Sequence, residues 1–154
     1  MKKLSTLLSI VFIVNQSFAQ DRVLQAESSV VSNGTATIKG AKVPYKVTAG
    51  TLPVWNAEGK PVASLFYTYY ERTDVTDKSR RPFVMSFNGG PGSASVWMHV
   101  AYTGPKILEI DKEGYPVQPY GVKDNPYSIL DVADIVYIDP VNTGFSRLLD
   151  TKAE

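Results

Sequence analysis

Residues 83–92, with the sequence Phe-Val-Met-Ser-Phe-Asn-Gly-Gly-Pro-Gly, decide how the rest of the chain is interpreted. The first half of this stretch is mostly apolar, which is typical of a buried strand. The glycines that follow end the strand, because glycine adopts backbone angles closed to other residues and lets another group approach the main chain. A glycine-rich loop between a buried strand and a helix is where α/β proteins present backbone N–H groups to a ligand or a transition state.

The sequence after this loop predicts a second copy of the strand-and-loop pattern. Residues 93–102 contain few helix breakers and predict a short helix that ends at Gly104 and Pro105. Residues 134–139, Asp-Ile-Val-Tyr-Ile-Asp, predict a second buried strand, and residues 141–146 form a loop beyond its end. Two buried strands separated by a helix favour an α/β arrangement with a parallel pair.

The sequence before the loop predicts antiparallel β structure. Residues 35–40 and 42–50 are β-rich runs joined near Gly40, residues 56–60 indicate a turn, and residues 61–70 form the densest β-forming run. Asn33 and Gly34 predict a further turn, and the charged residues 74–81 predict an exposed loop. The aromatic side chains of residues 61–70 have two interpretations, a stacking platform for a sugar or base and packing within a sheet, of which sheet packing is favoured.

The N-terminus has the pattern of a targeting segment. Lys2 and Lys3 precede an apolar run over residues 4–14, and small residues at Ser17 and Ala19 suit a signal peptidase. The alternative, a membrane anchor, is disfavoured because the run is far shorter than the roughly 20 apolar residues that span a bilayer. We therefore expect residues 1–19 to be a signal peptide, residues 20–32 a flexible mature N-terminus and residues 33–154 the folded domain, with no membrane span once the signal is removed.

Composition excludes several classes of site and partner. The chain has 154 residues, a net charge of +1 and no cysteine, and its only histidine is His99. Disulfides, thiol catalysis and a multi-histidine metal centre are therefore excluded, and neither a metal nor another cofactor is expected. A neutral chain gives no reason to expect nucleic acid as a partner. An exported chain without cysteines indicates a periplasmic or extracellular protein, and favours a bacterial source.

Residues 88–95, Asn-Gly-Gly-Pro-Gly-Ser-Ala-Ser, together with Gly104 and Pro105, resemble the signature of the serine carboxypeptidases, the S10 family of α/β-hydrolases. Residues 134–140, followed by residues 144–146, resemble the next strand and loop of that family. The resemblance runs from about residue 82 to residue 147. It implies that residues 33–154 form the N-terminal part of an α/β-hydrolase fold, with leading antiparallel strands, then parallel strands carrying an oxyanion loop, in an incomplete sheet.

The resemblance also implies roles for particular residues. Gly90 would supply one backbone N–H of the oxyanion hole, where no Cβ stands between the amide and the substrate. Asn88 and Gly89 match the positions that bind the free C-terminal carboxylate of a peptide substrate. Tyr102 stands where the family usually has a glutamic acid, and its hydroxyl can donate a hydrogen bond but cannot share an acidic proton.

The catalytic triad of the family is expected to lie outside this chain. No Gly-x-Ser-x-Gly sequence occurs, and His99 precedes any nucleophile in the order Ser, Asp, His that α/β-hydrolases follow. His99 is therefore interpreted as a structural histidine at the edge of the core. Ser93, Ser95 and Ser146 are rejected as nucleophiles because none lies on a glycine-flanked elbow and no second histidine is present to act as base.

The resulting hypothesis is that the parent protein is a serine-type carboxypeptidase acting on peptides with a free C-terminus, and that these residues alone are inactive. Two alternatives stay open: an esterase or acyltransferase on the same fold, and a secreted peptide-binding module without chemistry. The sequence does not set the residue preference at the scissile bond or the oligomeric state. Because a lone parallel pair with one short helix leaves a sheet face uncovered, the chain alone is expected to be poorly soluble or molten.

Overall fold

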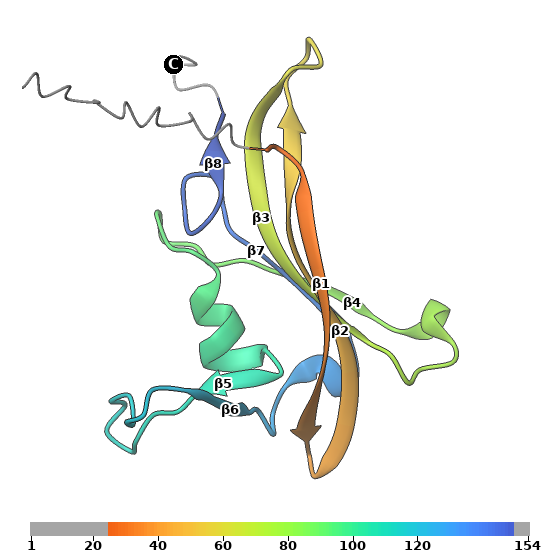
Figure 1. Cartoon of the computed structure of the whole chain (residues 1–154), viewed down its shortest axis with the longest axis vertical. Coiled ribbons are helices and arrows are strands. Elements are labelled where there is room, and N and C mark those ends of the chain that lie inside the picture. The colour runs from red at the N-terminus through yellow and green to blue at the C-terminus, as the bar shows by residue number, and fades with distance from the viewer. Residues whose placement is uncertain (1–24, 150–154) are drawn as a thin grey trace, which may run out of the picture.

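The computed structural model describes residues 25–149, so the predicted signal peptide (residues 1–19) and the start of the predicted flexible segment lie outside the described residues. A six-stranded sheet dominates the structure (Figure 1). Its strands, in spatial order, are β1 (Ser28–Ile38), β2 (Ala41–Trp55), β3 (Pro61–Arg72), β7 (Asp134–Ile138) and β4 (Phe83–Ser86), with the short β8 (Arg147–Leu148) pairing with β3. Within residues 25–149 no helix is both long enough and apolar enough to cross a bilayer.

The sheet combines an antiparallel meander with one parallel pair. β1, β2, β3 and β7 pair antiparallel in turn, whereas β4 and β7 run parallel, with Ser86 opposite Tyr137. The chain between β4 and β7 contains the π-helix η2 (Trp97–Thr103), a two-stranded sheet of β5 (Lys106–Leu108) and β6 (Val122–Asp124), and the 3₁₀ turn η3 (Ile129–Asp131). A second 3₁₀ turn, η1 (Lys78–Arg80), precedes β4. The predicted antiparallel strands followed by a parallel pair are confirmed.

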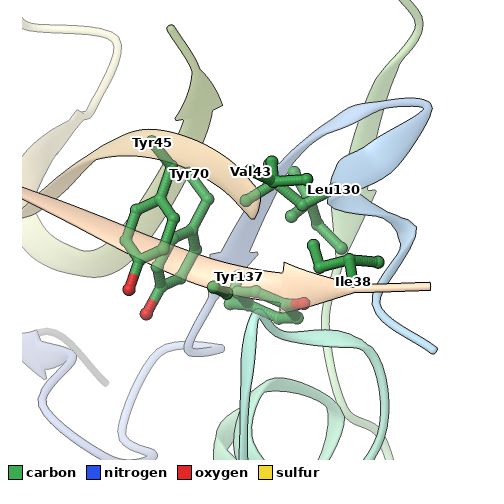
Figure 2. Close-up of a cluster of buried hydrophobic side chains, with 8 residues drawn as sticks. Ile38, Val43, Tyr45, Tyr70, Leu130 and Tyr137 are labelled. Atoms are coloured by element: carbon green, nitrogen blue, oxygen red, sulfur yellow. The ribbon is translucent and has the colours of Figure 1, made fainter. Parts of the chain in front are cut away.

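One face of the sheet carries the hydrophobic core. Figure 2 shows side chains from both halves of the chain meeting there: Ile38, Val43, Tyr45, Tyr70, Leu130 and Tyr137. Tyr45 and Tyr70 meet edge to face with ring centroids 5.4 Å apart. The helix η2 packs over this face, where its His99 stacks on Tyr137. Of the aromatic side chains of β3, Tyr70 packs in this core, as the sequence favoured, whereas Tyr67 and Tyr69 point to the opposite face.

The opposite face of the sheet is not covered by the described residues. Side chains alternate between faces along a strand, so the neighbours of the core residues point the other way. They line a shallow apolar hollow of ≈ 350 Å³, formed by Leu52, Leu65, Tyr67, Tyr69, Phe83, Met85, Val136 and Ile138. Phe83 is 59% exposed and Met85 is 58% exposed. The prediction that residues 83–87 form a buried strand is therefore wrong, because no residue of β4 is buried, whereas β7 is buried almost throughout.

Three local predictions were also wrong. β1 begins at Ser28, so residues 28–32 belong to the sheet and not to a flexible segment. Asn33 and Gly34 lie within β1, opposite Lys46 and Tyr45 of β2. The ring of Tyr45 packs against Gly34 so closely that a Cβ there would lie 2.6 Å from Tyr45 Cζ. The predicted join near Gly40 is confirmed by a turn at Lys39 and Gly40, which have positive φ angles of 49° and 81°. The helix begins only at Trp97, four residues later than predicted.

Candidate functional site

The glycine loop, residues 88–95, forms one wall of a hollow at the end of the parallel pair. Residues 88–93 face residues 140–143 across this hollow of ≈ 300 Å³. The second wall is the loop that follows β7. Because β4 and β7 are parallel neighbours, the loops after both strands emerge at the same edge of the sheet, where open α/β sheets bind ligands. The structure therefore brings together the two loops that the sequence predicted separately.

Gly90 presents an unpartnered backbone donor at this hollow. Within the part of the chain that the structure describes, the amide N–H of Gly90 has no hydrogen-bond acceptor. Its φ of 120° is one that residues with a side chain adopt only under strain. A Cβ placed on Gly90 would meet only Ser93 Oγ, 3.8 Å away. A free N–H on an unobstructed backbone is what an anionic ligand or an oxyanion requires.

Ser95 closes the glycine loop. Its Oγ accepts a hydrogen bond from the Asn88 amide at 3.2 Å and donates to the carbonyl of Ile138. The Ser95 amide donates to Asp139 Oδ1 at 2.8 Å. Both groups are buried, so Ser95 is held by β7 while it holds the first residue of the loop.

Asp139 connects the two loops. Its second oxygen, Oδ2, accepts a hydrogen bond from the Phe145 amide at 3.0 Å. A Cβ on Gly144 would overlap this oxygen, so only glycine lets the loop pass so close to the carboxylate. Ser146 Oγ donates to the Asp139 carbonyl at 2.7 Å and accepts from the Phe66 amide at 2.8 Å. Sequence reasoning did not single out Asp139, although an acid directly after a buried strand was a signal that could have found it.

The predicted substrate-binding residues fall into two places. Asn88, Gly89 and Gly90 line the same hollow. The side chain of Asn88 makes one weak internal contact, from Nδ2 to the Gly89 carbonyl at 3.4 Å, and so remains available at the hollow. Tyr102 is 63% exposed and lines a different hollow with Trp97, Leu108 and Pro116. The structure therefore does not bring Tyr102 together with the glycine loop.

His99 is a structural histidine, as the sequence predicted. Its Nε2 shares a hydrogen bond of 2.7 Å with the hydroxyl of Tyr70, and its ring stacks on Tyr137 with centroids 4.6 Å apart. Burial lowers the pKa of His99 to about 4, and the nearby carboxylate of Asp139 opposes that shift only in part. His99 is therefore neutral at pH 7 and already engaged.

Within residues 25–149, none of the three serines near the loops is hydrogen-bonded to a base that could activate it. Ser95 and Ser146 are buried, and their hydroxyl groups hold backbone atoms. Ser93 lines the hollow, but the only histidine of the chain is bonded to Tyr70. Among residues 25–149, no cluster of three or more histidine or acidic side chains could hold a metal ion.

Comparison with known proteins relates this chain to one family. The chain is 32% identical over 142 residues to serine carboxypeptidase-like 20 of Arabidopsis thaliana, covering 92% of this chain and 25% of that protein. It is 34% identical over 83 residues to carboxypeptidase Y homolog A of Pyrenophora tritici-repentis, covering 53% of this chain and 14% of that protein. These relatives are eukaryotic and give no support to the bacterial source that the sequence favoured.

The fold has a counterpart among solved structures. A prohormone-processing carboxypeptidase from Saccharomyces cerevisiae superposes with a TM-score of 0.54 at 24% identity, over 71% of this chain and 22% of that one. This likeness identifies the architecture as part of an α/β-hydrolase fold. The chain spans about a quarter of the length of the first of these relatives. The family model for serine carboxypeptidases, peptidase S10, matches residues 38–154, and the chain therefore belongs to that family.

Proposed function

We propose that this chain supplies the oxyanion loop of a serine-type carboxypeptidase whose Ser, Asp and His triad lies in further sequence. The observation that carries the proposal is the unpartnered Gly90 N–H at the mouth of a hollow. Peptide hydrolysis by a serine passes through an oxyanion, and α/β-hydrolases take one of its two N–H donors from the loop after an early strand.

Recognition of the substrate C-terminus is assigned to Asn88 and Gly89. They lie beside Gly90, and a side-chain amide with a backbone N–H suits a carboxylate. Tyr102 is included in the carboxylate site only because it stands at the family's glutamic acid position. Its ring lines another hollow, and among the described residues no contact with Asn88 supports the assignment. The substrate is then a peptide with a free C-terminus, and the N-terminal pattern of residues 1–19 supports an exported protein.

The test is turnover of a blocked dipeptide by the full-length protein that carries this chain. We expect hydrolysis of the dipeptide with a free carboxylate, and a loss of kcat of at least about 10²- to 10³-fold in Gly90→Pro, which lacks the donor N–H and cannot adopt the φ of 120° of Gly90. Lys112→Pro is the matched control: it places a proline in the exposed turn of residues 111–114, away from the hollow, and is expected to leave kcat unchanged. Full activity in Gly90→Pro, or no hydrolysis by the unaltered protein, would contradict the proposal.

An esterase or acyltransferase on the same fold is the second candidate. The position of Tyr102, away from Asn88 and without an acidic proton, favours a site that is less strict toward a carboxylate. Comparing kcat/KM for a blocked dipeptide, its amide and its ester separates the two candidates. A carboxypeptidase prefers the free acid, whereas an esterase hydrolyses the ester whether or not a carboxylate is present.

A further inference from the structure

We propose that Asp139 is a positioning residue that fixes the glycine loop, and with it the direction of the Gly90 N–H. Its carboxylate would set the rate of the chemical step without touching the substrate. This inference rests on the proposed function for its kinetic consequence. The hold of Asp139 on the loop can also be measured without any activity.

The glycine loop depends on a single anchor. Among residues 25–149, no backbone N–H of residues 89–94 donates a hydrogen bond, so this part of the loop is not tied to the fold by its own amides. The first residue of the loop, Asn88, is bound through its amide to Ser95 Oγ. Because the loop both starts and ends at Ser95, the place of Ser95 determines where Gly90 lies.

Asp139 is one of three groups that hold Ser95, beside the Ile138 carbonyl, which accepts from Ser95 Oγ, and the His99 amide, which donates to the Ser95 carbonyl. The Asp139 side chain is buried, and its Oδ1 accepts the Ser95 amide at 2.8 Å while Oδ2 accepts the Phe145 amide at 3.0 Å. Within the described part of the chain Asp139 makes no ion pair, and its carboxylate accepts only backbone amides. A charged acceptor strengthens such bonds. The carboxylate thus joins the two walls of the hollow at one point.

Asparagine at position 139 distinguishes the hydrogen-bonding role of Asp139 from a role in packing alone. Asp139→Asn keeps the shape of the side chain, but one of its two acceptor oxygens becomes an amino group that faces an N–H donor. One of the two loop contacts is then lost. Ser95→Ala is a second, smaller change that releases the Asn88 amide and leaves Asp139 in place.

The kinetic experiment uses the full-length protein and a blocked dipeptide. We expect kcat to fall about 10²- to 10³-fold in Asp139→Asn, as for loss of an oxyanion donor, with KM unchanged because the substrate still binds. Asp111→Asn is the control for loss of a carboxylate charge outside the hollow: Oδ1 of Asp111 accepts the amides of both Glu113 and Tyr115, so asparagine can keep both bonds. It is expected to retain wild-type kcat and KM.

The second readout is hydrogen exchange at the Asn88 amide. That amide does not bond to Asp139, so faster exchange there in Asp139→Asn reports movement of the loop and not the direct loss of a bond. We expect at least tenfold faster exchange in Asp139→Asn and in Ser95→Ala, and no change in Asp111→Asn. Wild-type kcat and wild-type Asn88 exchange in Asp139→Asn would overturn the inference, as would an equal kcat loss in Asp111→Asn. If the unaltered protein hydrolyses no peptide, the proposed function fails and the exchange measurement alone decides the inference.

Discussion

At the scale of single residues, His99 shows how burial removes a histidine from chemistry. Its ring packs against the rings of both Tyr70 and Tyr137, where desolvation disfavours the imidazolium. The folded state therefore holds the neutral ring, with a pKa near 4, whereas an unfolded chain has the ordinary value of about 6.5. Between pH 4 and pH 6.5 the unfolded chain therefore binds a proton on His99 that the folded chain does not, which favours unfolding.

The stabilising contribution of neutral His99 is complete above pH 6.5 and is lost as the pH falls toward 4. The loss amounts to about 3 kcal/mol in the free energy of unfolding. His99→Gln can keep a hydrogen bond to Tyr70 but does not titrate. We expect the midpoint of thermal unfolding of the full-length protein to fall less between pH 7.5 and pH 4.5 in His99→Gln than in the unaltered protein. Equal falls would show that His99 is not the titrating group, because acidic side chains contribute equally to both proteins.

At the scale of elements, a buried ion pair fixes the start of the parallel pair. Arg81 lies two residues before β4, and its Nε donates to Asp134 Oδ1, at the start of β7, at 2.6 Å. Their side chains are only 6% and 10% exposed. Asp134 also accepts the Arg72 amide at the end of β3. The charged segment predicted as an exposed loop therefore ends in a residue that aligns three strands.

Removing one partner of this pair leaves a buried, uncompensated charge. Arg81→Met is expected to lower the free energy of unfolding by about 3–5 kcal/mol, since such a charge is costly. Arg80→Met, in the neighbouring exposed position, is the control and should change stability by less than about 0.5 kcal/mol. Chemical denaturation of the full-length protein measures both. Similar small effects of the two variants would show that the pair contributes little.

At the scale of the whole molecule, the uncovered apolar face is the dominant feature. Its side chains come from β2, β3, β4 and β7, and no described element packs over them. An exposed hydrophobic face of this kind marks a surface that another layer covers, or a site of aggregation. The free side of β4, at the end of the strand order, adds an unpaired edge.

We therefore expect the 154-residue chain, produced alone, to be poorly soluble or molten and to bind a hydrophobic dye. Met85→Thr combined with Leu65→Thr should raise its solubility, because both side chains lie on the uncovered face. Val30→Thr is the control, since Val30 is 73% exposed but lies outside that face. A soluble monomer with a sharp cooperative thermal transition would contradict this expectation.

The sequence by itself determined the order of the main elements and the place of the glycine loop between them. Apolar runs bounded by glycine and proline predicted β3, β4 and β7, because local breakers and side-chain alternation act within a few residues. A glycine-rich loop at Asn88, Gly89 and Gly90 followed from residue types, whereas the roles proposed for these residues came from the family resemblance.

The tertiary structure alone decided what depends on contacts between distant segments. Gly34 lies in a strand because the ring of Tyr45 packs against it from the next strand. Tyr102 lies apart from Asn88 because η2 directs it toward the β5–β6 hairpin. Asp139 acquires its role only when β7 lies beside β4 and the amides of Ser95 and Phe145 converge on it. No local pattern encodes such convergence, because the partners are far apart in sequence and meet only in the folded sheet.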